Sequence, residues 1–139
     1  NSLKKKHKFF VIEDAAQALL SKSDDGIYCG TKYEVGCFSL SITKPINMIY
    51  GGFCATNSKK IYNKLIAIRN NGVNAEPENA RLELASELGL NLKPSDLHAS
   101  IGLINLNSRN TRMKNLKKIF EYYKKNIKNK KINFLSVEG

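Results

Sequence analysis

The sequence is poor in cysteine and has no long apolar run, and each lack argues against a class of protein. Its 139 residues include three cysteines, an odd number with no Cys-x-x-Cys pair: Cys29, Cys37 and Cys54. This usage argues against a disulfide framework and a zinc site, so we expect reduced, partly buried thiols and no metal. No stretch approaches the roughly 20 apolar residues of a membrane-spanning helix, and no apolar segment of signal-peptide type follows the basic first residues. We therefore expect a cytoplasmic protein without a membrane partner.

The strong positive charge is compatible with a basic nucleic-acid-binding module. The formal net charge is +11, carried mostly by lysines spread along the chain. The densest basic runs, residues 4–8 and 124–131, lack the interleaved aromatic and arginine side chains that stack on bases. We favour a solvated charged surface and expect no nucleic-acid partner.

The apolar pattern of the first half predicts an α/β fold. Residues 9–12 form a continuous apolar run, typical of a strand buried on both faces of a parallel sheet, and residues 15–20 favour a short helix. A polar stretch over 21–34 has turn points at its glycines. A second strand over 35–41 places Ser39 and Ser41 on one face, and Gly51-Gly52 opens a third strand over 53–56.

The second half of the sequence predicts helices. One begins at a cap formed by Asn57 or Ser58 and ends near Gly72, and a short one is expected around 82–88. Another begins at a Ser95-Asp96 cap, and a long basic helix covers about 111–128. The buried face of the Ser95 helix is expected to include Leu97, Ile101, Ile104 and Leu106.

Two positions in this pattern are suited to chemistry. Asp14 follows the first predicted strand, and ligands of open α/β sheets bind at the carboxyl ends of the strands. Lys44 lies in the loop between the second and third strands, where a reactive group can be presented. Each residue alone has an ordinary explanation, Asp14 as a helix cap or turn residue and Lys44 as a solvated charge.

Four motifs in chain order resemble the DegT/DnrJ/EryC1/StrS family of sugar aminotransferases, which depend on pyridoxal 5'-phosphate (PLP). They are the run EDAAQA over 13–18, Cys37-Phe38-Ser39 followed by Lys44, Gly51-Gly52, and Asn91 ahead of SDLHA over 95–99. The resemblance extends from residue 9 to about 123 and matches only the middle of a family member. We therefore expect an incomplete central portion with both ends cut.

The resemblance implies a role for each of five residues. Lys44 matches the catalytic lysine that is attached to the cofactor, and Asp14 matches the acid that keeps the cofactor ring nitrogen protonated. Gln17 matches a residue beside the ring, and Ser39 matches a phosphate ligand. Asn91 matches a phosphate ligand that acts across a dimer interface, which implies a homodimer. The sequence departs from the family at Lys93, where the family has an arginine with a bidentate fork.

The resemblance also implies the fold and the function. The fold is the second half of the large domain of a fold-type-I PLP-dependent transferase, a three-layer α/β/α domain, over residues 1–107. Residues 108–139 are then a helix and the start of the small C-terminal domain. The activity implied is amino-group transfer, with glutamate as donor, to a nucleotide-linked keto sugar, commonly in cell-surface polysaccharide synthesis. The alternative is a catalytically inactive, truncated remnant of such an enzyme.

Overall fold

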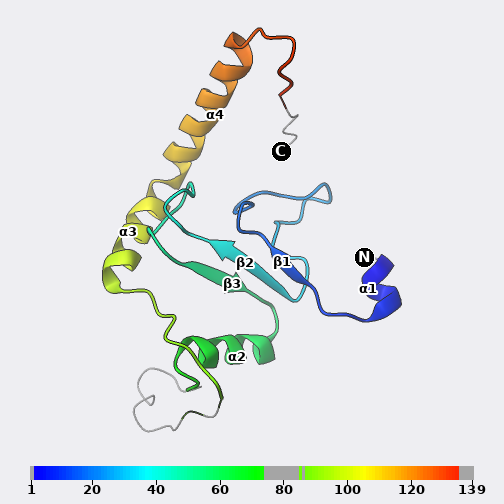
Figure 1. Cartoon of the computed structure of the whole chain (residues 1–139), viewed down its shortest axis with the longest axis vertical. Coiled ribbons are helices and arrows are strands. Elements are labelled where there is room, and N and C mark those ends of the chain that lie inside the picture. The colour runs from blue at the N-terminus through cyan, green and yellow to red at the C-terminus, as the bar shows by residue number, and fades with distance from the viewer. Residues whose placement is uncertain (1, 74–84, 86, 135–139) are drawn as a thin grey trace.

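The computed structural model describes residues 2–73, 85 and 87–134 of the chain (Figure 1). The described part has four helices and three strands. In chain order they are α1 (Ser2–His7), β1 (Ile12–Asp14), β2 (Val35–Ser39), β3 (Gly52–Ala55), α2 (Lys59–Arg69), α3 (Asp96–Asn107) and α4 (Arg109–Asn126). None of the described helices is both long enough and apolar enough to cross a membrane.

The strands form one mixed sheet in the order β1-β2-β3. β1 and β2 are parallel, with Ile12 level with Val35 and Asp14 level with Cys37. β2 and β3 are antiparallel, with Cys37 opposite Cys54 and Ser39 opposite Gly52. The three predicted strands therefore exist, and the antiparallel pair is joined by the loop 40–51 that contains Lys44.

The first strand differs from its prediction in position and burial. It comprises Ile12–Asp14 instead of residues 9–12, and the side chains of Phe9, Phe10 and Ile12 are exposed. The prediction of a strand buried on both faces was wrong for the described chain, because no described helix packs on β1 and its only neighbouring element is β2. The apolar core lies elsewhere and is small: Ala15, Val35, Phe38, Ile46, Met48 and Ala67.

Residues 15–20 are turns and not the short helix that their composition predicts. The Ala18 N–H donates to the Ala15 carbonyl and the Ser21 N–H donates to the Ala18 carbonyl, each at 3.0 Å. Leu20 has a positive φ of 68°, which a right-handed helix does not allow. Two successive turns thus replace the helix, although Asp14 accepts the Ala16 N–H at 3.1 Å as a helix cap would.

The predicted start and end of α2 are confirmed. Ser58 is the N-cap, and its hydroxyl accepts the Ile61 N–H. At the other end Gly72 has a φ of +83°, and its N–H donates to the Ala67 carbonyl at 2.8 Å. The short helix expected around 82–88 falls largely outside the described residues.

The cap of α3 is confirmed, but its buried face was predicted wrongly. Ser95 caps the helix by accepting the His98 N–H. Leu97, Ile104 and Leu106 are exposed, and Ile101 is half-buried. The face turned toward the loop 40–51 is small and polar instead, because the helix approaches closely: a Cβ on Gly102 would lie 3.2 Å from Met48 Cβ.

α4 follows α3 after Ser108 and extends away from the sheet (Figure 1). The expected boundary between residues 107 and 108 therefore falls at the break between two helices. Whether it separates two domains stays a prediction.

Candidate functional site

Asp14 and Ser39 end neighbouring parallel strands at the same edge of the sheet. Asp14 is level with Cys37, two residues before Ser39, and the next residue, Ala15, donates its N–H to the Cys37 carbonyl at 2.9 Å. The Asp14 side chain is exposed. Because parallel strands run in one direction, the carboxylate of Asp14 and the hydroxyl of Ser39 both stand at the carboxyl edge, where open α/β sheets bind ligands.

A tight turn after β2 connects Ser39 to Lys44. The Ser39 and Ser41 hydroxyl oxygens are 3.2 Å apart, and the Ser41 N–H donates to the Ser39 hydroxyl at 3.3 Å. The Lys44 N–H in turn donates to the Ser41 carbonyl at 2.9 Å. The two hydroxyls and the backbone of Lys44 are thus linked within six residues of chain.

The rest of the loop is anchored against β2 and the core. The Leu40 N–H donates to the Gly51 carbonyl and the Met48 N–H donates to the Leu40 carbonyl, both at 2.9 Å. Met48 and Ile46 are buried, whereas Lys44 itself is half-buried. The loop therefore has a fixed base from which the lysine is presented.

Lys44 lines a hollow of about 380 Å³ together with residues of α4. Arg112, Leu116 and Ile119 form the helix side of this hollow. Arg112 was not among the site residues predicted from the sequence. Its spacing of four and seven residues from Leu116 and Ile119 was the available signal, since these positions share one face of a helix.

Asn105 connects α3 to the lysine loop and to α4, the two elements that line this hollow. Its side-chain amide donates to the Asn47 carbonyl in the lysine loop at 2.9 Å, and its Oδ1 accepts from the Arg112 guanidinium. The Asn47 side chain donates to the Lys44 carbonyl at 3.2 Å. A chain of hydrogen bonds therefore runs from Lys44 through two asparagines to Arg112.

The other two predicted site residues are not placed with this group. Gln17 is exposed in the turns after β1, three residues beyond Asp14, and no hydrogen bond among the described residues joins it to Ser39 or Lys44. Asn91 forms an isolated antiparallel bridge with Asn70, directly after α2. Its neighbour Leu92 lines a hollow with Gly52 and Arg69, and no hydrogen bond among the described residues joins Asn91 to Lys44.

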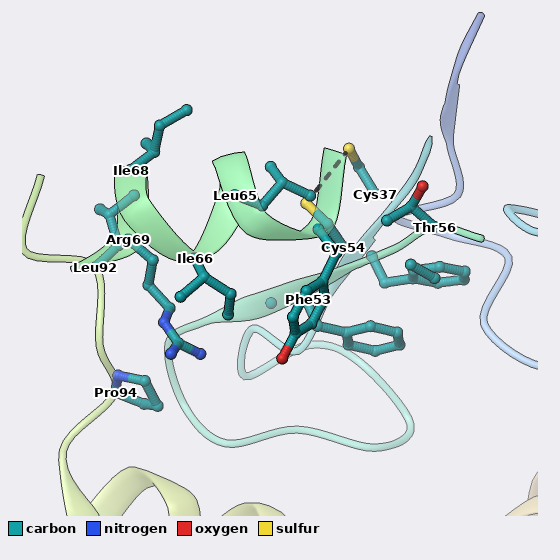
Figure 2. A pocket seen from close by; sticks show the side chains of 14 residues that line it. Cys37, Phe53, Cys54, Thr56, Leu65, Ile66, Ile68, Arg69, Leu92 and Pro94 are labelled. Carbon is teal, nitrogen blue, oxygen red and sulfur yellow. Dashed lines mark hydrogen bonds between the residues drawn. The ribbon is translucent and has the colours of Figure 1, made fainter. Parts of the chain in front are cut away.

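A second hollow, of about 790 Å³, lies between α2 and the strands β2 and β3 (Figure 2). Phe53, Leu65, Ile66 and Arg69 are among its lining residues, and none of the predicted site residues is. Within the described ranges, no three His, Cys, Asp or Glu side chains come together in a way that could hold a metal ion.

Comparisons with known proteins agree with the motifs. The sequence model of the DegT/DnrJ/EryC1/StrS aminotransferase family matches residues 1–138. The chain is 32% identical over 125 residues to GDP-perosamine synthase of Escherichia coli O157:H7, which covers 90% of this chain and 33% of that protein. It is 28% identical over 127 residues to a UDP-4-amino-4,6-dideoxy-N-acetyl-beta-L-altrosamine transaminase of Campylobacter jejuni, covering 90% of this chain and 32% of the relative.

A solved structure extends the likeness to the fold. The DegT DnrJ EryC1 StrS aminotransferase of Brucella abortus superposes with a TM-score of 0.71 at 25% identity, over 89% of this chain and 32% of that one. The fold-type-I α/β assignment is thereby confirmed for the part of the fold that is present. The chain spans about a third of the length of the curated relatives it matches.

Proposed function

Because this chain belongs to the DegT/DnrJ/EryC1/StrS aminotransferase family, we propose that it is the lysine-bearing part of an enzyme that aminates a nucleotide-linked keto sugar with glutamate as donor. The observation that carries the proposal is the shared edge of β1 and β2. There Asp14 ends β1 and Ser39 ends β2, and Ser41 and Lys44 follow in the loop after β2, in the order of the family motifs. A catalytically inactive remnant of the same enzyme is the alternative.

The chemistry of these groups fits PLP, the cofactor that the family implies. PLP, when bound, supplies an electron sink for bond changes at the carbon that bears the amino group. Asp14 is exposed at the strand edge, with one carboxylate oxygen bonded to the Ala16 N–H, and would hold a proton at the ring nitrogen. The Ser39 and Ser41 hydroxyls are donors for a phosphate group.

Lys44 is the residue we assign to covalent attachment of the cofactor and to proton transfer. Lys44 is half-buried in a loop whose base is fixed by backbone hydrogen bonds, and an amine is a suitable group for both tasks. Gln17 beside the ring and Asn91 as a phosphate ligand from a second subunit complete the proposed set. The Asn91 assignment implies a homodimer, because the family residue that Asn91 matches acts on the cofactor phosphate across a dimer interface.

The described chain offers only part of a binding site. The hydroxyls of Ser39 and Ser41 are the phosphate donors that we assign within one subunit, and a partial site binds weakly because missing contacts cannot preorganise the ligand. We expect the 139-residue chain by itself to show no amino transfer from glutamate. Glutamate-dependent turnover by the purified chain would refute this expectation.

The proposed function is tested in a chimera that supplies the parts of a relative that this chain does not match. The chain replaces the matching third of the E. coli GDP-perosamine synthase, and amino transfer by the chimera is measured. We expect turnover that is lost with Lys44→Ala and kept with Lys60→Ala, an exposed lysine of α2. Equal turnover by the two variants would exclude the assigned role of Lys44.

A further inference from the structure

Cys37 and Cys54 face each other across the antiparallel pair β2–β3. They are direct partners in the strand register, and their sulfur atoms are 3.9 Å apart (Figure 2). Both are free thiols in the structure. Neither has a role in the proposed amino transfer.

The backbone at this position is suited to a disulfide. The Leu40 N–H donates to the Gly51 carbonyl, so by the alternation of an antiparallel ladder the Cys37–Cys54 pair is a non-hydrogen-bonded one. Such pairs have Cα atoms about 4.5 Å apart, within the range of about 4.4–6.8 Å that disulfides accept. A rotation of the two side chains can therefore bring the sulfurs into bonding distance without moving the strands.

The pair is also accessible, and the third cysteine stands apart from it. Cys54 is exposed and Cys37 is half-buried, and both line the hollow between the sheet and α2. Cys29 belongs to the loop 21–34, where its N–H donates to the Ser21 carbonyl. No sulfur contact of Cys29 is found among the described residues. The geometry therefore favours the Cys37–Cys54 disulfide over the two pairings that would include Cys29.

We propose that Cys37 and Cys54 are a redox-active dithiol that hydroperoxides convert to a disulfide. One thiol attacks the peroxide and becomes a sulfenic acid, releasing water when the oxidant is hydrogen peroxide. The second thiol then attacks the sulfenic sulfur, releasing a further water as the S–S bond forms. The dithiol loses two electrons and two protons, and one peroxide is reduced to two waters.

The disulfide would join the two strands that flank the loop 40–51. It closes a ring from residue 37 to residue 54, and this ring contains Ser39, Ser41 and Lys44. Oxidation therefore restrains the hairpin that presents the lysine, whatever reaction that lysine serves. A cross-link of this kind acts by limiting the conformations open to the ring.

Peptide mapping of the whole 139-residue chain tests the proposal. The folded chain is treated with hydrogen peroxide, its remaining thiols are alkylated, and it is digested with trypsin. Because trypsin does not cleave before Pro45, Cys37 and Cys54 remain in one peptide, residues 33–59, and Cys29 lies in another, residues 23–32. The expected product is peptide 33–59 without alkyl groups and lighter by two hydrogens, restored to the alkylated form by prior dithiothreitol.

Variants and unfolding distinguish fold-directed pairing from random oxidation. Cys29→Ser should leave the product unchanged, whereas Cys37→Ser and Cys54→Ser should each abolish it. Oxidation in urea should give disulfides that include Cys29 as well, because the strand register no longer selects the pair. Disulfides of Cys29 forming as readily in the folded chain, or sulfinic acid at Cys54 without a disulfide, would overturn the proposal.

Discussion

The carboxylate of Glu13 accepts a hydrogen bond from the backbone N–H of Gly30 at 2.9 Å, across 17 residues of chain. Its other oxygen accepts the N–H groups of Lys32 and Tyr33, each at 2.8 Å. One side chain at the end of β1 thus closes the loop 21–34 against the sheet. This places the loop beside the edge at which Asp14 stands.

Replacing Glu13 with alanine should open this loop. A hydrogen bond to a charged group contributes about 1.5–3 kcal/mol, and about 1.4 kcal/mol corresponds to a tenfold change in an equilibrium constant. We expect amide hydrogen exchange at Gly30, Lys32 and Tyr33 to accelerate by about tenfold or more. Asp24→Ala removes an exposed carboxylate of the same loop and serves as the control. Unchanged exchange at the three amides of Glu13→Ala would contradict the closing role.

The Asp25 carboxylate should titrate at unusually low pH. Hydrogen bonds from Lys32 and then Ser23 lower the pKa of Asp25 from its ordinary value of 3.8 to about 2. A folded-state pKa below the unfolded one stabilises the fold above pH 3.8, and this stabilisation is lost as the pH falls toward 2. An NMR titration should show the pKa of Asp25 rising toward 3.8 in Lys32→Met and rising less in Ser23→Ala. Equal pKa values of Asp25 in the wild type and in Lys32→Met would show that the ion pair between Asp25 and Lys32 does not form.

Gly36 and Gly26 allow the cost of a steric clash to be compared with the cost of backbone strain. A Cβ at Gly36 would lie 1.9 Å from the Gly30 carbonyl oxygen, whereas a Cβ at Gly26 would meet no atom within 4 Å. Gly26 has a φ of +77°, so Gly26→Ala costs only the strain of a left-handed residue, about 1–2 kcal/mol. Gly36→Ala must move β2 away from the loop, and we expect a cost of about 3 kcal/mol or more. Urea denaturation compares the two variants, and similar midpoints would be inconsistent with the close approach.

Asn105 should hold the lysine loop in place. Its amide donates to the Asn47 carbonyl at 2.9 Å and to the Ile101 carbonyl at 3.1 Å. Asn105→Ala removes the link between α3 and the loop, a net contribution of about 1 kcal/mol for one hydrogen bond. Hydrogen exchange over residues 40–51 should accelerate several-fold, and Asn107→Ala, at the exposed end of α3, should leave it unchanged. Matching exchange rates in the two variants would refute the link.

The sequence predicted those parts of the fold that local signals determine. Ser58 and Ser95 each cap the helix that follows them, since a cap depends on residues within one turn. The three strands were found from short apolar runs and glycine pairs. Asp14 follows the first strand, as the sequence indicated, and the parallel pairing of β1 with β2 brings Ser39 to the same edge.

The features that depend on distant contacts were not predicted. Helical periodicity indicated a buried face with Leu97 and Ile104, but α3 approaches the loop 40–51 through Gly102 and Asn105. Spacing places Arg112 on one face of α4 with Leu116 and Ile119, but its position beside Lys44 depends on where α4 packs. Burial of the apolar run that includes Phe9 requires helices packed on the faces of β1, and none of the described helices packs there.

Borohydride trapping tests whether Lys44 carries the cofactor. The chimera with the E. coli relative is incubated with PLP and reduced, and its tryptic peptides are mapped. We predict a stable pyridoxyl adduct on Lys44 within peptide 33–59, absent from the Lys44→Ala variant. An adduct that forms only on other lysines, or no adduct in a chimera that folds, would contradict the account.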